Sequence, residues 1–252
     1  MAEIIPRKTV VELRYPAKLS FVSKVEQVGE TLLDRMETEH WERSAFSLQI
    51  LDKKRRQRVI LESKRLGIEC DGPIAEQREA TIRGYDLLAD AARNLGIDKV
   101  ARVGVRQWFA LEIGGNSEQK LIEKLCEAHL RTKLMERAMK MSVQDFAIIL
   151  ELQDKTDPQF TGRISYGVMP RDQWGSQTPY QKPSHLGSDG VKQIVDELPN
   201  EFVFVDVDKR IDSGKTDSSF SLERCKRFTQ KVQGDLRLIP KQLIDDIRES
   251  QP

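Results

Sequence analysis

The sequence has few cysteines, few histidines and almost no excess of either charge, and each shortage argues against a class of function. Its 252 residues include three cysteines, Cys70, Cys126 and Cys225, which form no CxxC pair and lie at no zinc-type interval from a histidine. We therefore expect buried free thiols and no metal site built from neighbouring residues. Lys+Arg 41 against Asp+Glu 40 gives a formal net charge of +1, so no global field attracts nucleic acid or anionic membrane.

Long apolar runs are also missing. The first residues, MAEIIPRKTVVELRYP, contain no uninterrupted apolar stretch of the signal-peptide type, and no later run approaches the ~20 residues that a membrane span needs. We therefore expect a cytoplasmic protein without membrane contact. With 38% hydrophobic and 32% charged residues, the chain is long enough to bury one large core or two joined ones.

Two stretches with the same pattern organise the chain. Val10–Pro16 and Val100–Ile113 alternate apolar and polar side chains, as half-buried strands do. VELR at residues 11–14 matches VGVR at residues 103–106 with an offset of 106 − 14 = 92 residues. The sequence therefore predicts a single domain of two pseudo-repeats, residues 1–96 and 97–252, each too small to bury a sheet face well alone.

Each half is predicted to have the order β-α-β-β-β-α. After its first strand, the first half has a helix opened by the capping-box spacing Ser23–Glu26, then strands at Ala45–Leu51, Arg58–Ser63 and Leu66–Cys70, and a helix from Pro73 that stops at Gly96. The second half has a helix at Ser117–Leu130, strands at Asp145–Gln153, Phe160–Val168 and Glu201–Lys209, and a helical region from Phe220 to Glu249. We expect an α+β fold: one curved, mainly antiparallel sheet with helices on one face.

A loop insertion at about residues 170–200 interrupts this order, because Pro170–Gly190 has neither helical nor strand periodicity. A surface excursion is one interpretation of this segment. The other is a functional loop in which Trp174 is an aromatic contact for a partner.

If the valines of the strands face the helices, the opposite sheet face collects charged side chains of both signs. These are Arg14, Arg102, Arg106, Asp206 and Asp208. One interpretation is an ion-pair network that fixes strand register. The other is a concave polar groove that recognises a ligand or partner through its arginines. Asp206 and Asp208 have no clear third ligand beside them, so we expect no metal and no cofactor.

The only dense basic cluster lies between two predicted strands. It comprises Lys53, Lys54, Arg55, Arg56 and Arg58. Its charges suit the phosphates of nucleic acid, or they keep a solvated hairpin tip from pairing with another edge. SGKT at residues 213–216 imitates the end of a P-loop but lacks the glycine required five positions before Gly214.

The stretches TVVELRYP, LGIDKVARVGVRQWF and FVFVDVD resemble a sporadically distributed family of prokaryotic proteins of about this size, whose function is unknown. Members have Glu-Leu-Arg-aromatic, Arg-x-Gly-Leu-Arg-Tyr and Leu-Asp-Ile-Asp strands, which correspond here to Glu12–Tyr15, Arg102–Gln107 and Val205–Asp208. Val105 and Gln107 stand where the family has Leu and Tyr. The family's patchy distribution resembles that of genes in mobile or defence-associated neighbourhoods.

We therefore expect a non-enzymatic binding or adaptor protein, a component of a multi-protein bacterial defence system, whose partner is another protein encoded nearby. A nucleic-acid-binding protein that uses the basic hairpin or the polar sheet face is the first alternative. An enzyme with a site on that face is the second alternative. It comes last because the sequence displays no nucleophile–base pair and no phosphate loop. Self-association to a homo-oligomer stays open.

Overall fold

The computed structural model describes residues 2–113, 118–129, 146–172, 195–213 and 219–249, apart from single positions at 19, 39, 45, 53, 73, 156 and 237. Its main feature is a nine-stranded sheet in the order β2-β3-β4-β5-β1-β7-β10-β9-β8. Every neighbouring pair of strands in it is antiparallel. The predicted α+β fold with a mainly antiparallel sheet is therefore confirmed.

The elements follow the chain in this order. The large sheet contains β1 (Ala2–Arg14), β2 (Trp41–Ser44), β3 (Ser47–Asp52), β4 (Gln57–Glu62), β5 (Arg65–Asp71), β7 (Arg102–Ile113), β8 (Ala147–Gln153), β9 (Phe160–Pro170) and β10 (Glu201–Asp212). A small second sheet pairs β6 (Lys99–Val100) with β11 (Phe220–Ser221). The helices are α1 (Ser20–Met36), α2 (Ile74–Asn94), α3 (Glu118–His129), α7 (Leu222–Leu236) and α8 (Leu238–Glu249).

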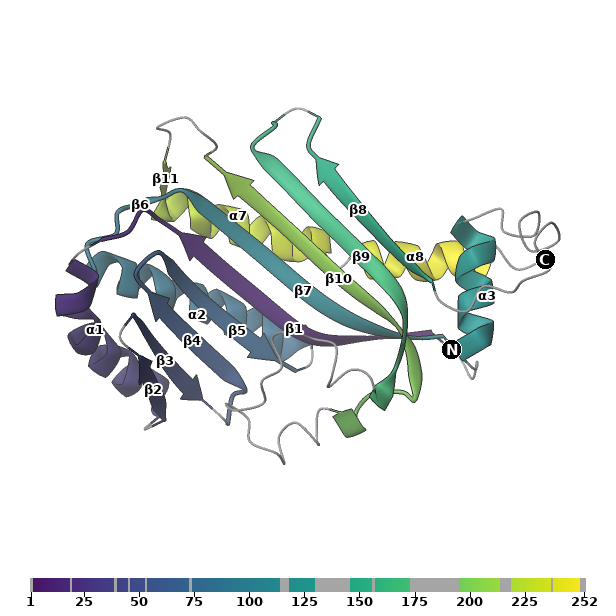
Figure 1. Ribbon diagram of the computed structural model, residues 1–252, viewed down its shortest axis with the longest axis horizontal. Helices are drawn as coiled ribbons and strands as arrows, with labels where there is room; N and C mark the ends of the chain where they lie inside the picture. The colour runs from purple at the N-terminus through teal and green to yellow at the C-terminus, as the bar shows by residue number, and fades with distance from the viewer. Residues whose placement is uncertain are drawn as a thin grey trace.

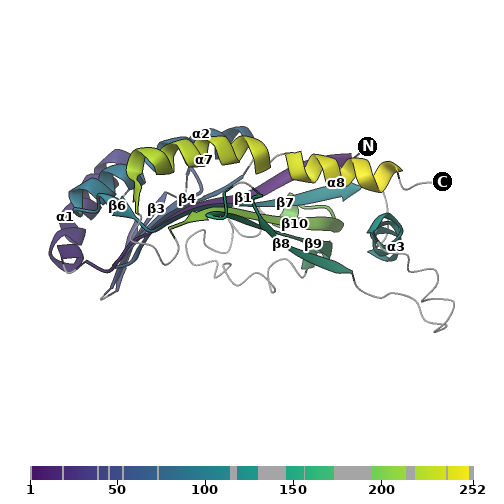
Figure 2. The same ribbon diagram turned by 90° about the horizontal axis from the view of Figure 1, so that it is seen from above.

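The helices lie on one side of the sheet, as predicted. Figure 2 shows α1, α2, α7 and α8 above a curved sheet that bends away from them, so the face without helices is on the concave side of the curve. We call this the open face. In Figure 1, β5, β1, β7 and β10 run side by side through the middle of the sheet.

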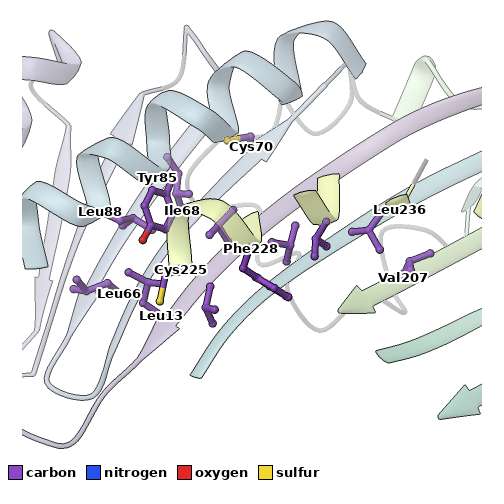
Figure 3. Close-up of a cluster of buried hydrophobic side chains, with 14 of the residues drawn as sticks. Leu13, Leu66, Ile68, Cys70, Tyr85, Leu88, Val207, Cys225, Phe228 and Leu236 are labelled. Carbon is purple, nitrogen blue, oxygen red and sulfur yellow. The ribbon is translucent and has the colours of Figure 1, made fainter. Parts of the chain in front are cut away.

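The strand faces that meet the helices form the core. Val11 and Leu13 of β1, Val103 of β7 and Val205 of β10 are completely buried, as their alternation predicts. Figure 3 shows the contact between the layers, where Tyr85 of α2 lies close to the sheet. Its hydroxyl donates a hydrogen bond to the carbonyl oxygen of Leu222 at 2.6 Å, which joins α2 to the start of α7. Residues from both halves of the chain share this one hydrophobic cluster.

The sequence predicted how α2 ends and how α1 begins, and the structure agrees with the first prediction but not with the second. Gly96 has φ +75° and follows α2, with Gly96 N–H bonded to Arg93 O at 2.9 Å and Ile97 N–H to Ala92 O at 2.7 Å. This is the predicted glycine stop. The predicted capping box is wrong, because α1 begins at Ser20 and the Ser23 hydroxyl donates back to Ser20 O at 3.1 Å.

Several strands differ from the predicted elements. β1 begins at Ala2 and β10 continues to Asp212, beyond the expected strands. β2, β6 and β11 were not predicted, and the expected single terminal helical region is β11 followed by two helices. The predicted ends Ala45, Pro73, Ser117, Leu130 and Asp145 lie outside the described residues.

The two halves share a strand order when it is traced outward from the centre. It is β1-β5-β4-β3-β2 in the first half and β7-β10-β9-β8 in the second. β1 and β7 pair with each other, so the two strands with matching sequence patterns lie in one sheet. A shared order does not establish equivalent positions for Arg14 and Arg106, so the internal duplication stays a prediction.

Two absences concern the described residues. The three cysteines are buried and none of them forms a disulfide, as expected from their spacing. Within the described ranges, no helix combines the length and apolar character needed to cross a membrane.

Candidate functional site

The open face carries its charges in rows that cross the central strands. Directly paired residues of antiparallel strands point to the same side of a sheet, so the register places them. Starting at the end of β1, and read across β5, β1, β7 and β10, the rows are Arg65-Arg14-Arg102-Asp212, Gly67-Glu12-Gly104-Arg210, Glu69-Val10-Arg106-Asp208 and Asp71-Lys8-Trp108-Asp206. All five of the sheet-face residues predicted from the sequence therefore lie on one surface.

Arg106 and Asp206 form the best-ordered part of this surface. Arg106 donates from Nε to Asp206 Oδ1 at 2.8 Å, and its Nη2 bonds to Oδ2. Trp108 Nε1 donates to the same Oδ1 at 3.0 Å, and the Arg106 guanidinium lies 5.2 Å from the Trp108 ring centroid. The predicted contact between Arg106 and an aspartate is confirmed, and the two hydrogen bonds from Arg106 with the one from Trp108 favour the structural interpretation of this pair.

Asp208 is held less well than Asp206. Its nearest cation is Arg210 Nη1 at 3.6 Å, beyond hydrogen-bond range. Burial raises the pKa of Asp208, although Arg102, Arg210 and Arg106 pull it down. The described residues contain no group of three or more Asp, Glu, His or Cys side chains suited to a metal ion.

Asp208→Asn is expected to leave the free energy of unfolding at pH 7 within about 0.5 kcal/mol of the parent value, or to raise it. The raised pKa means that the folded protein disfavours the charged carboxylate, and the amide removes that charge. Asp206→Asn is the matched comparison and should be destabilising, because it weakens the contact with Arg106. Urea unfolding of both variants measures this, and a clear loss of stability in Asp208→Asn would contradict it.

Arg102 has no ion-pair or hydrogen-bond partner among the described residues, unlike its neighbours. Its Nε is buried without a hydrogen-bond partner. Burial lowers the pKa of Arg102, and so do the charges of Arg210 and Arg14, against the opposite effect of Asp208 and Glu12. Arg14 itself contacts Glu12 Oε1 through Nε at 2.5 Å. The start of β7 therefore presents a partly desolvated cation with Arg14 directly opposite on one side, Asp212 directly opposite on the other, and Arg210 near.

A second, more buried charge cluster lies further along β1. Lys8 Nζ is 3.1 Å from Glu69 Oε2 and 3.7 Å from Asp71 Oδ1. Arg58 Nη2 reaches the same Glu69 oxygen at 2.6 Å. Burial by itself raises the pKa of Glu69, but Lys8 and Arg58 together hold that pKa below its ordinary value. The sequence did not reveal this cluster, since charged residues in a strand are ordinarily assigned to solvent.

The basic hairpin between β3 and β4 is largely paired within the chain. Arg55 contacts Asp52 at 3.1 Å and Glu37 at 3.3 Å. Arg56 contacts Glu197 at 3.3 Å, and Arg58 belongs to the Glu69 cluster. Lys54 is exposed, whereas Lys53 lies outside the described residues. These pairs reduce the charge available for phosphates and favour the interpretation as a structural hairpin tip.

One short segment covers part of the open face. Leu198 packs with Trp108, Ala110 and Phe202 in a small apolar cluster. Glu197 beside it contacts Arg7 Nη1 at 3.4 Å, next to a hollow of about 560 Å³ at the start of β1. The rest of the predicted loop insertion, including Trp174, lies outside the described residues, as do Gly214, Lys215 and Thr216 of the SGKT stretch.

No protein-family model matches the chain, and no curated protein matches it. The candidate function therefore depends on the geometry of the open face.

Proposed function

We propose that the protein is a non-enzymatic binding protein, an adaptor that holds another protein on the open face of its sheet. The observation that carries this proposal is Arg102. It is a partly buried arginine with an unpartnered Nε and no ion pair among the described residues, in the row Arg65-Arg14-Arg102-Asp212.

The loss of stability caused by like charges in this row supports a role in binding. Like charges directly opposite each other on neighbouring strands destabilise a sheet. Glu12 relieves two members, since it contacts Arg14 at 2.5 Å and Arg65 at 3.3 Å. Asp212 is directly opposite Arg102 on β10, but no ion pair joins the two side chains, and binding sites often retain groups that reduce stability. A partner that supplies an acidic group would compensate it.

The state of the side chains that could react supports binding over catalysis. Burial raises the pKa of the Cys70 thiol and of the Cys225 thiol to about 12, so neither is an activated thiolate near neutral pH. Asp206 on the open face already accepts hydrogen bonds from Arg106 and Trp108. Asp206 and these two thiols therefore have structural roles.

Arg102→Glu is expected to abolish co-purification of the partner when the protein is co-expressed with the products of its neighbouring genes. The new carboxylate would lie directly between Arg14 and Asp212 with Arg210 also near, so two arginines would still neutralise it while the surface charge at this position is reversed. Arg163→Glu is the control. Arg163 is on β9, 3.7 Å from Glu151 and 48% exposed, so its reversal should leave the partner bound.

Partner binding that survives Arg102→Glu, or is lost equally in both variants, would contradict the proposal. A partner of nuclease or ATPase type would support the expected role in a defence system. Recovery of nucleic acid in place of a protein would favour the first alternative.

A further inference from the structure

We infer that the protein forms a symmetric dimer in which β8 of one copy pairs, antiparallel, with β8 of a second copy. This inference goes beyond the proposed function and does not depend on it. It concerns one edge of the large sheet, whereas the partner proposed above occupies the open face.

The outer edge of β8 can accept another strand. β8 is an end strand of the large sheet, and β9 is its one strand partner among the described residues. In Figure 1, β8 is the outermost strand on its side, and no other described strand runs along its outer edge. Proteins protect such an edge by keeping it short, or with lysine, proline or a β-bulge. β8 has seven residues, no lysine and no proline, and it pairs with β9 without a bulge.

The opposite edge of the sheet is different. β2 has four residues, and two of them, Glu42 and Arg43, are charged. Arg43 also forms an ion pair with Glu26 of α1. A short strand with charged side chains is a protected edge. The features that protect β2 are therefore missing from β8.

Apolar side chains of β8 are exposed on both sides of the sheet. Ile149, Leu150 and Leu152 are 59%, 44% and 46% exposed to solvent. Leu150 lies in the row of Val207 on the helix side, whereas Ile149 lies in the row of Asp206 on the open face. A neighbouring strand with apolar side chains in the same rows would remove this surface from water on both sides.

The sequence of β8 is complementary to itself. A twofold axis that keeps the helices of both copies on one side of the joined sheet places one residue of β8 opposite itself. Leu150 is the middle residue, so only the register centred on Leu150 pairs all seven residues. It places Ile148 opposite Leu152 and Ile149 opposite Glu151 of the second copy. A register centred on Glu151 would place two carboxylates opposite each other, which is destabilising.

The surroundings of β8 suit the Leu150-centred register. The charge of Glu151 already has a partner in its own chain, because Glu151 Oε1 is 3.7 Å from Arg163 Nε. On the helix side, a hollow of about 220 Å³ is lined in part by Leu152 of β8, Leu236 of α7 and Ile239 of α8. In the dimer, Ile148 of the second copy would lie beside Leu152 and extend this apolar region.

The first experiment measures the mass of the purified full chain by sedimentation velocity over a range of concentrations. The parent protein should have twice the mass of one chain. Leu150→Lys should raise the dimer Kd by about 100-fold or more, because two like charges replace the central apolar contact. Trp41→Lys is the control at the β2 edge. Trp41 is 53% exposed, and its replacement should leave the dimer Kd unchanged.

A pair of variants at Ile149 tests the register and does not depend on the folding of Leu150→Lys. Ile149→Lys and Ile149→Glu lose the same exposed side chain and differ in the sign of the new charge. The new lysine would attract Glu151 of the second copy, and the new glutamate would repel it. Because this contact occurs twice in the dimer, the Kd of Ile149→Glu should be about 10-fold or more above that of Ile149→Lys.

Four results would overturn the inference. A parent protein that remains monomeric at every concentration, or a dimer that survives Leu150→Lys unchanged, would show that β8 does not join two copies. A mass that grows beyond the dimer, or dissociation by Trp41→Lys, would indicate head-to-tail contacts that include β2. Equal Kd values for the two Ile149 variants would rule out the register centred on Leu150. Agreement of all these measurements with the stated expectations would support the symmetric dimer.

Discussion

Glu69→Gln should lower the free energy of unfolding by about 3 kcal/mol or more, because it leaves two buried cations without their shared carboxylate. The side chains of Glu69 and Lys8 are 6% and 5% exposed, and Arg58 is 13% exposed. Water reaches these groups poorly, so it cannot replace the lost charge. Urea unfolding measures the change. Glu79→Gln is the control, since Glu79 and Arg83 are 72% and 74% exposed and such pairs contribute about 0.5 kcal/mol or less.

The same carboxylate gives stability a defined pH dependence. The folded-state pKa of Glu69 is lowered, so its contribution is fully present above the unfolded value near 4.5 and is lost as the pH falls through the folded value. Glu69→Gln should therefore be most destabilising at neutral pH and nearly neutral in strong acid. A constant difference between the two proteins from pH 7 to pH 3 would contradict this linkage.

A double variant separates the buried charge from the packing. Lys8→Met with Glu69→Gln removes a cation together with its carboxylate, and it should be less destabilised than the two single effects added together. A double-variant effect equal to the sum of the two single effects would mean that Lys8 and Glu69 do not interact energetically, despite the 3.1 Å distance between Lys8 Nζ and Glu69 Oε2.

The sequence predicted the core side of the sheet because that side obeys one simple rule. Val103, Val105 and Val205 alternate with polar residues, and only one face of a curved sheet is covered by helices. The same rule fails at Lys8 and Glu69. Both are charged residues on the open face, yet they are buried in contact with each other. The pattern of a single strand contains no information about a partner 61 residues away.

The functional residues show the same limit. Alternation placed Arg106, Asp206 and Asp208 on one face, but it could not decide which aspartate Arg106 contacts. Asp208 is the direct cross-strand neighbour of Arg106, whereas the ion pair forms diagonally with Asp206, where Trp108 supplies another donor. Long side chains reach along the strands as well as across them, so register alone does not fix their contacts. Arg102 was predicted on this face, and its lack of a partner emerged only from the geometry.

Short elements escaped prediction for related reasons. All four residues of β2 are exposed, so no buried face imposes an alternating pattern on them. β6 and β11 have two residues each, too few for any periodicity, and they form because Phe220 and Val100 pair beside the end of the large sheet. Because of this pairing, the predicted terminal helical region begins with the two-residue strand β11, and the helices α7 and α8 follow it.

Arg106→Met should reduce the free energy of unfolding by about 2 kcal/mol, which corresponds to a fall of about 4–8 °C in melting temperature for a chain of this size. Methionine retains most of the length and the apolar stem, so loss of charge dominates over loss of packing. Asp206 is 11% exposed at its side chain and would keep only the Trp108 N–H as a described donor. The cost is smaller than at Glu69, because Arg106 is 33% exposed and water partly screens the pair.

Two further variants decide what Arg106 does. Combining Arg106→Met with Asp206→Asn should recover much of the lost stability, because the amide can still accept from Trp108 without a buried charge. Arg163→Met, at an exposed pair on the same face, should change stability by about 0.5 kcal/mol or less. If Arg106→Met leaves the melting temperature unchanged but abolishes partner binding, Arg106 belongs to the binding site. A loss of stability with partner binding intact places the recognition function at Arg102 and its neighbours alone.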